Sequence, residues 1–168
     1  MAKVITIFKP PRITKKAAQW EKAYIAGVVD AKVGLAVYPH RVKGRARGKL
    51  FATLGFHSHY IKLLKMVQER YGGIIKFVDM SKEKGITTYR LDISRHENIL
   101  LLMQDISEYL IAKNRQADLL RKYCQSRLEA LKNVEHSSQA PITEKERSIV
   151  RELTRLNKLS LHPERSPL

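Results

Sequence analysis

The hydrophobic pattern of this chain switches between a helical and a strand period several times, and this alternation constrains the fold more than any other feature. Residues 14–31 have helical spacing, and residues 33–56 follow as two strand-like runs joined by a polar arm. A second helical run over 58–71 precedes another pair of strand-like runs, 74–80 and 86–94. The strands therefore come as antiparallel pairs bounded by helices, not as a strand-helix-strand series. This order predicts a domain of the α+β class.

The second half of the chain is predicted to be mainly helical. Helical spacing begins at Glu97 and continues well beyond residue 120, and we place a break between two helices near Tyr109. A linker of small and polar residues then precedes a short amphipathic helix near the C-terminus. The start of that helix carries a capping box, with Thr143 followed three residues later by Glu146.

The length of 168 residues suits one ordinary domain and leaves little room for a second core. We assign residues 1–135 to this domain, with residues 1–12 as a basic lead-in that ends in two prolines. Residues 136–168 are assigned to a linker, a short C-terminal helix and a tail.

Positive charge is the strongest indication of a partner. The net charge is +16, and the excess is concentrated early, because residues 1–56 hold 12 basic and only 2 acidic residues. A solvated surface usually mixes charges of both signs, so a local excess favours a polyanionic partner. Between an anionic membrane surface, general solubility and nucleic acid, the asymmetry favours nucleic acid.

Cysteine usage and hydropathy bear on the compartment. A single cysteine, Cys124, excludes an internal disulfide framework and a cysteine-rich zinc site, which favours a reducing intracellular setting. No run approaches the roughly 18 apolar residues that a membrane helix needs. Residues 1–10 are too short and too quickly charged for a secretory signal, so we expect neither export nor a membrane partner.

Several segments together carry a resemblance to a known family. Residues 25–30 read IAGVVD, which matches the first six letters of the LAGLIDADG motif conservatively. Support comes from residues 71–73, which end the second predicted helix, from the segment YLIAKNRQA at 109–117, and from the closing helix at 143–158. The chain thus resembles the LAGLIDADG homing endonucleases over about residues 20–158, specifically the smaller members with one motif.

This resemblance implies an αββαββα saddle with C-terminal helices. In the family, four antiparallel strands form a curved sheet whose concave polar face lies in the major groove of double-stranded DNA. The motif helix packs against a second copy, so one motif implies a homodimer that addresses two half-sites. The residues expected at that interface are Ile25, Ala26, Gly27, Val29, Asp30 and Ala31.

The motif departs from the family at the position that matters for cleavage. The family's eighth letter is the acid that holds the divalent metal beside the scissile phosphate, and here it is Lys32. An ammonium has three donors, no lone pair and the metal's own sign of charge. Lys113 matches a basic residue that the family keeps near the cleavage centre, and Asp30 remains at the sixth letter. We expect no metal and no cofactor, and therefore a binding protein, not an enzyme.

Basic residues on the strand pairs are the candidate DNA contacts. Five cations occupy every second position of the polar arm, which would place them on one side of an extended ribbon. Two more lie on the polar face of the second strand pair, two lie in its turn, and one is the matched family lysine. These residues are Arg41, Lys43, Arg45, Arg47, Lys49, Lys76, Arg90, Lys82, Lys84 and Lys113.

The sequence leaves several functions open. The favoured one is a nuclease-inactive, homodimeric DNA-binding protein that recognises or regulates a DNA element. An active homing endonuclease is the first alternative, in which Asp30 or a shifted register would restore a Mg²⁺ site. The second is an RNA-binding splicing cofactor of the maturase kind, and the third is a basic interaction module with neither activity.

Overall fold

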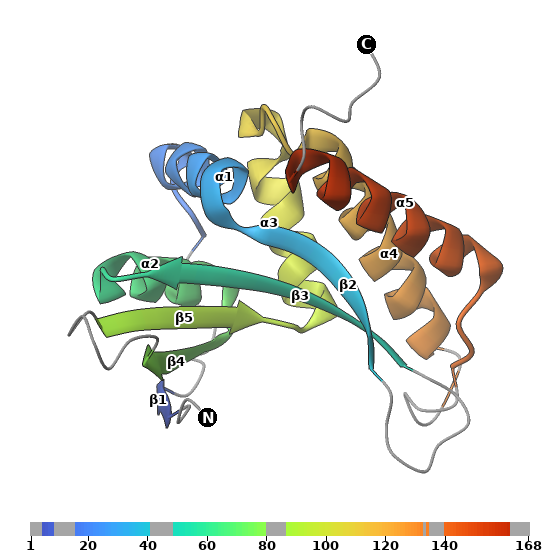
Figure 1. Cartoon of the computed structure of the whole chain (residues 1–168), viewed down its shortest axis with the longest axis horizontal. Helices are drawn as coiled ribbons and strands as arrows, with labels where there is room; N and C mark the ends of the chain where they lie inside the picture. The colour runs from blue at the N-terminus through green and yellow to red at the C-terminus, as the bar shows by residue number, and fades with distance from the viewer. Residues whose placement is uncertain are drawn as a thin grey trace.

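The computed structural model describes residues 5–8, 16–40, 49–79, 87–132, 134 and 140–161. Within these residues, five strands and five helices follow one another in the order β1, α1, β2, β3, α2, β4, β5, α3, α4, α5 (Figure 1). The strands are β1 (Ile5–Phe8), β2 (Gly34–His40), β3 (Lys49–Ser58), β4 (Ile74–Asp79) and β5 (Thr87–Ile93). The helices are α1 (Gln19–Lys32), α2 (Ile61–Tyr71), α3 (His96–Ile106), α4 (Asn114–Lys132) and α5 (Glu144–Leu161), with a 3-10 turn at Ser107–Tyr109. No helix in these ranges is long and apolar enough to cross a membrane.

All strands belong to one antiparallel sheet in the order β1-β4-β5-β3-β2. The four strands expected from the sequence are present, and the α+β class is confirmed. The fifth strand is a difference, because β1 lies within the segment expected to be a basic lead-in and pairs with β4 at the edge of the sheet. Its sequence, ITIF, is rich in the β-branched and aromatic residues that strands favour.

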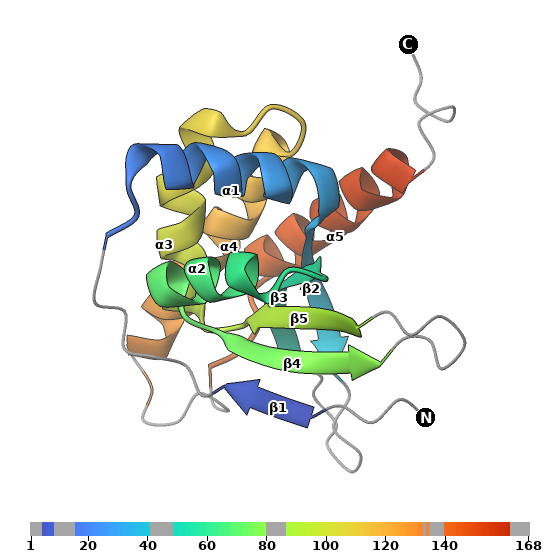
Figure 2. The same ribbon diagram turned by 90° about the vertical axis from the view of Figure 1, so that its left-hand side faces the viewer.

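The sheet has one covered and one open face. Helices α1 to α4 form a layer over one face (Figure 2). Alternate strand residues point into that layer and are buried, namely Leu35, Val37, Leu54, Phe56, Leu91 and Ile93. Within the described part of the chain no helix lies across the opposite face, so residues on the other alternation remain accessible there.

The strand register is supported by two glycines at the end of α2. Gly72 and Gly73 have φ angles of 70° and 104°, in the region that residues with a Cβ rarely adopt. A Cβ at Gly73 would lie 2.8 Å from the carbonyl oxygen of Asp92. Glycine at both positions therefore ends α2 and allows β4 to start directly against β5, as the sequence predicts.

The predicted break near Tyr109 is confirmed. Helix α3 ends at Ile106, the 3-10 turn follows, and α4 starts only at Asn114. Residues 110–113 thus form a short loop between α3 and α4, and this loop reaches the end of α1 as described below.

The capping box of the C-terminal helix is also confirmed. The Thr143 hydroxyl accepts a hydrogen bond from the Glu146 amide at 3.1 Å, and the Glu146 carboxylate accepts one from the Thr143 amide at 2.8 Å. Helix α5 runs beside α4 in Figure 1 and adds Ile149 and Leu153 to the main core. Asn157 donates a hydrogen bond to the Leu35 carbonyl at 2.8 Å, so α5 also satisfies the outer backbone of the edge strand β2.

A buried charge pair fixes α5 to α4. The Glu146 side chain is fully buried, and its Oε1 lies 3.6 Å from Nη1 of Arg127 and accepts a hydrogen bond from the Ser126 hydroxyl at 3.2 Å. Arg127 also donates to the carbonyl oxygens of Pro141 and Ala140. Because both charges are out of water, each depends on the other and on these hydrogen bonds.

We predict that Arg127→Met destabilises the protein by about 3 kcal/mol, since it leaves the Glu146 carboxylate buried without a cation. The measurement is urea unfolding at a fixed protein concentration. Arg147→Met is the matched control, because Arg147 is mostly exposed and lies 3.9 Å from Glu144; it should change stability by less than about 0.5 kcal/mol. Equal losses of unfolding free energy in the two variants would contradict the stabilising role of the buried Arg127–Glu146 pair.

Candidate nucleic-acid interface

The open face of the sheet holds two of the cations selected from the sequence. Lys76 on β4 and Arg90 on β5 are direct partners in the strand register and lie on the face away from the helices. Both are tied to one carboxylate: Lys76 Nζ lies 3.0 Å from Oδ2 of Asp92, and Arg90 Nε lies 2.5 Å from Oδ1. The cluster carries one net positive charge and spans two neighbouring strands.

The guanidinium of Arg90 lies over Gly55 of β3. A Cβ at Gly55 would lie 3.4 Å from both Nε and Nη2 of Arg90. His57, the register partner of Arg90 on β3, lies beside it. Burial lowers the pKa of His57, and the Arg90 charge lowers it further, so the neutral imidazole is favoured next to the guanidinium.

Two aromatic residues extend the open face towards the polar arm. Tyr38 on β2 and Phe51 on β3 are direct register partners, and they are 57% and 46% exposed. They are not among the residues selected from the sequence, although the alternation along residues 33–38 places Tyr38 on the face opposite the buried Leu35 and Val37. An exposed aromatic pair at the base of a basic arm is suited to contacts with sugars and base edges.

The remaining selected cations belong to the start of β3 and to segments outside the described residues. Lys49 is the first residue of β3, but only its backbone is described. The others lie outside the described residues: Arg41, Lys43, Arg45, Arg47, Lys82 and Lys84.

The end of α1 is held by a reciprocal pair of charges. The Asp30 carboxylate accepts hydrogen bonds from the backbone amides of Ile111 (2.7 Å), Ala112 (3.2 Å) and Lys113 (2.9 Å). In return, the Lys113 ammonium donates to the carbonyl oxygens of Val29 (2.9 Å) and Val33 (3.0 Å). We call this arrangement the Asp30–Lys113 clamp.

The clamp gives both residues a structural role that the sequence did not suggest. Both Asp30 oxygens are bonded to amides before α4, and α1 remains helical through Lys32, with the Val33 amide bonded to the Val29 carbonyl at 3.2 Å. No unwinding redirects Asp30. Burial lowers the pKa of Lys113, and Asp30 partly opposes that effect. The Lys113 nitrogen binds the carbonyls of Val29 and Val33 at the end of α1, and its contact with DNA stays a prediction.

Lys32 is the last residue of α1 and its side chain is exposed. A cation at a helix C-terminus is favoured by the helix dipole. A divalent metal requires anionic or carbonyl oxygen ligands, and here the position offers an ammonium while the nearest motif carboxylate is already bonded to three amides. The residues at the end of α1 therefore do not fit Mg²⁺.

The interface expected on α1 needs correction. Ile25, Ala26 and Val29 have no exposed surface, because they face the protein's own core. The helical period puts a different set on the outside: Trp20, Tyr24, Gly27 and Ala31 repeat at intervals of four, three and four residues. Trp20 is 66% exposed and Tyr24 is 53% exposed. Of the six expected interface residues, Gly27 and Ala31 belong to this outer stripe, and Asp30 belongs to the clamp.

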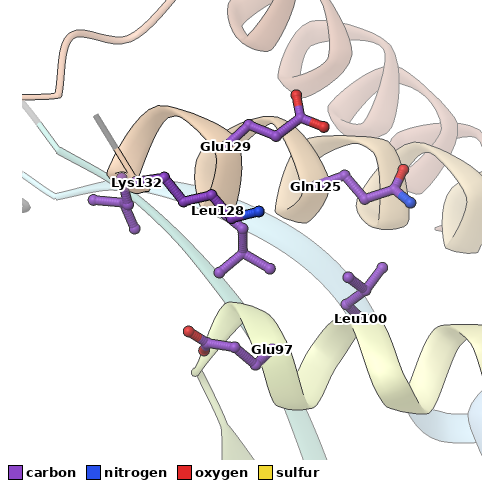
Figure 3. A pocket seen from close by; sticks show the side chains of 7 residues that line it. Glu97, Leu100, Gln125, Leu128, Glu129 and Lys132 are labelled. Carbon is purple, nitrogen blue, oxygen red and sulfur yellow. The ribbon is translucent and has the colours of Figure 1, made fainter. Parts of the chain in front are cut away.

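A shallow groove lies elsewhere, between α3 and α4. In Figure 3 the side chains of Leu100 and Leu128 lie between the two helices, and charged side chains border them. The groove is lined by Glu97, Leu100, Gln125, Leu128, Glu129, Leu131 and Lys132. None of the residues selected from the sequence belongs to it.

The architecture has counterparts among solved structures. The chain is similar to the archaeal intron-encoded homing endonuclease I-Vdi141I, with 17% identity and a TM-score of 0.61 over 82% of this chain and 84% of that one. It is also similar to the homing endonuclease I-CvuI, with 17% identity and a TM-score of 0.58 over 82% of each chain. This chain has the LAGLIDADG homing endonuclease fold.

A third similar structure belongs to a longer chain, of which the match covers only a part. The LAGLIDADG homing endonuclease I-GzeII shares 13% identity with a TM-score of 0.54, and the match covers 88% of this chain but only 50% of that one. No family model matches the sequence, and no curated protein matches it. At these identities the similarity establishes the LAGLIDADG fold, and α1 is the helix in which the motif-like residues lie.

We predict that Asp30→Ala lowers stability by about 2 kcal/mol, because three amides lose their common acceptor. Asp30→Asn should recover part of the loss, since an amide oxygen can still accept. Urea unfolding at a fixed protein concentration is the measurement. Asp118→Ala on α4 removes a partly exposed carboxylate paired with Arg121 and Lys122, and it should cost less than about 1 kcal/mol. A loss in Asp30→Ala no larger than in this control would contradict the clamp.

Proposed function

We propose that this protein binds double-stranded DNA as a homodimer and does not cleave it. It would act by recognising a DNA element, as a regulatory or scaffolding protein does. The observation that carries the proposal is the chemistry at the end of α1, where Lys32 replaces a metal-binding acid and the oxygens of Asp30 are bonded to amides.

The similar structures support DNA as the partner. I-Vdi141I is complexed with DNA, I-CvuI is in complex with its target, and I-GzeII is in complex with a DNA target. The net charge of +16 agrees with a polyanionic partner. The open face of the sheet adds Lys76, Arg90 and the exposed pair of Tyr38 and Phe51, a mixture of charge and flat apolar surface that a major groove can accept.

The loss of cleavage follows from the donor set. In a metal-dependent nuclease, the ion activates water and stabilises the leaving oxygen, and a lysine supplies neither function. A lysine does lower the cost of holding a phosphate nearby. Lys32 would thus keep the binding of the central phosphates and remove the reaction.

Dimerisation is supported by the outer stripe of α1. Gly27 and Ala31 follow the larger Trp20 and Tyr24 along it, so a second helix can approach closely over the C-terminal half of α1. The match to half of I-GzeII agrees with a chain that forms half of a complete unit. Two Lys32 side chains near a two-fold axis would repel each other, so the dimer should be tighter on DNA than free.

The central experiment selects bound sequences from random duplex DNA with the purified full chain. We expect a two-fold symmetric site and preference for that duplex over structured RNA, because a sheet that fits the B-form major groove does not fit the A-form one. If each subunit neutralises roughly five phosphates, log K should fall with log salt at a slope near −9. Preference for RNA would favour the maturase-like alternative. Equal binding of all duplexes would leave only a basic interaction module.

The same site in a supercoiled plasmid tests the absence of cleavage. With Mg²⁺ or Mn²⁺ present, we expect binding without double-strand cuts. Reproducible, metal-dependent cuts at the selected site would overturn the inactive assignment and restore the active endonuclease.

We predict that Gly27→Leu abolishes the dimer without unfolding the chain. A Cβ at Gly27 meets no atom within 4 Å, and leucine is a better helix former than glycine by about 1 kcal/mol. Analytical ultracentrifugation with and without the selected duplex measures the outcome. Gln19→Leu is the matched control, since it adds the same side chain to an exposed position of α1 outside the stripe. A Gly27→Leu protein that dimerises like the control would contradict the interface.

A further inference from the structure

In the cluster of Lys76, Arg90 and Asp92, the carboxylate of Asp92 binds the two cations in different ways. Asp92 binds Arg90 through the inner nitrogen Nε, with Oδ1 at 2.5 Å, and binds the ammonium of Lys76 with Oδ2 at 3.0 Å. Within the described part of the chain, the outer nitrogens Nη1 and Nη2 of Arg90 have no hydrogen bond. Asp92 therefore leaves the outer fork of the guanidinium available, and it engages one of the three ammonium donors of Lys76.

Gly55 sets the position of that fork. The guanidinium lies directly over Gly55, where any larger residue would contact Nε and Nη2 at about 3.4 Å. The hydrogen bond from Nε to Asp92, with the room that glycine leaves at position 55, restricts the rotamers of a long side chain before any ligand arrives. The Arg90 side chain is 39% exposed, so it remains accessible on the open face.

We propose that Arg90 reads a guanine in each DNA half-site and that Asp92 is the residue that positions it. This inference rests on the proposed function, since it requires the open face to meet a DNA major groove. The outer fork of an arginine matches the O6 and N7 acceptors of guanine, and no other base edge in the groove offers two acceptors in this arrangement. Lys76, a single donor group shared with the same carboxylate, is the phosphate contact or a non-specific neighbour.

The role of Asp92 separates affinity from specificity. A carboxylate on a DNA-facing surface opposes phosphate binding, so its removal should strengthen binding to all sequences. If Asp92 also orients Arg90, the same removal should weaken discrimination of guanine. A residue with only an electrostatic or only a structural role would not move the two quantities in opposite directions.

The experiment uses the full chain and the site selected from random duplex DNA, with each base pair then replaced in turn. For the wild type we expect one symmetric pair of guanines whose replacement weakens binding roughly 5- to 150-fold. Arg90→Lys keeps the charge and should abolish that preference while binding to unrelated DNA stays within about two-fold. Asp92→Ala should strengthen binding to unrelated DNA and reduce the guanine preference at least three-fold, and Asp92→Asn should retain more of it. Lys76→Gln is the control, with weaker binding to every duplex and an unchanged preference.

The outcomes separate this inference from the function on which it rests. Failure of the wild type to prefer any duplex sequence would overturn both. A wild type with a selected site, but with the same base preferences in Arg90→Lys, would overturn the role of Arg90 alone. A guanine preference unchanged in Asp92→Ala would overturn the positioning role of Asp92. Thermal unfolding of each variant confirms that the comparison is between folded proteins.

Discussion

The Asp30–Lys113 clamp is the interaction on which the central part of the structure depends. At the end of α1 the carbonyl oxygens of Val29 and Val33 can each accept a hydrogen bond from a side chain, and the segment before α4 offers three backbone amides. One carboxylate satisfies three amides and one ammonium satisfies two carbonyls, so the two ends are joined in both directions. Each charge also has the sign that the helix end it faces prefers. The position of α1, and hence of Lys32 and of the outer stripe, follows from this joint.

The clamp also shows that the fold of the α1 end does not depend on an acid at position 32. Asp30 holds the backbone before α4, and position 32, to which the motif resemblance assigns a metal-binding acid, is a lysine. Lys32 is exposed and ends its helix, so packing does not restrict which residue type stands at position 32. Under the proposed function, a lysine at this position would end cleavage while the sheet, its open face and the helix stripe stay as they are.

The sequence predicted the elements well because the signals for them are local. The switches between a helical and a strand period of hydrophobic residues predicted the strand pairs and the helices. The glycines at 72 and 73 predicted the end of α2, and the capping box predicted the start of α5. The short strand β1 was missed because four residues between basic and proline-rich flanks carry little periodic signal. The interface on α1 was assigned from motif letters without regard to helical phase, and the 3.6-residue period puts Ile25, Ala26 and Val29 into the core. The clamp and the Arg127–Glu146 pair join residues that are distant along the chain, so no spacing rule could reveal them.

The most direct measurement of the central claim is a crystal structure of the protein on its selected duplex in the presence of Mn²⁺, whose anomalous signal identifies the ion. The account predicts Lys32 of both copies near the central phosphates, with Asp30 still bonded to the amides of residues 111–113 and no manganese held by protein carboxylates. Manganese bound between Asp30 and a scissile phosphate would contradict it, because the end of α1 would then be a working metal site.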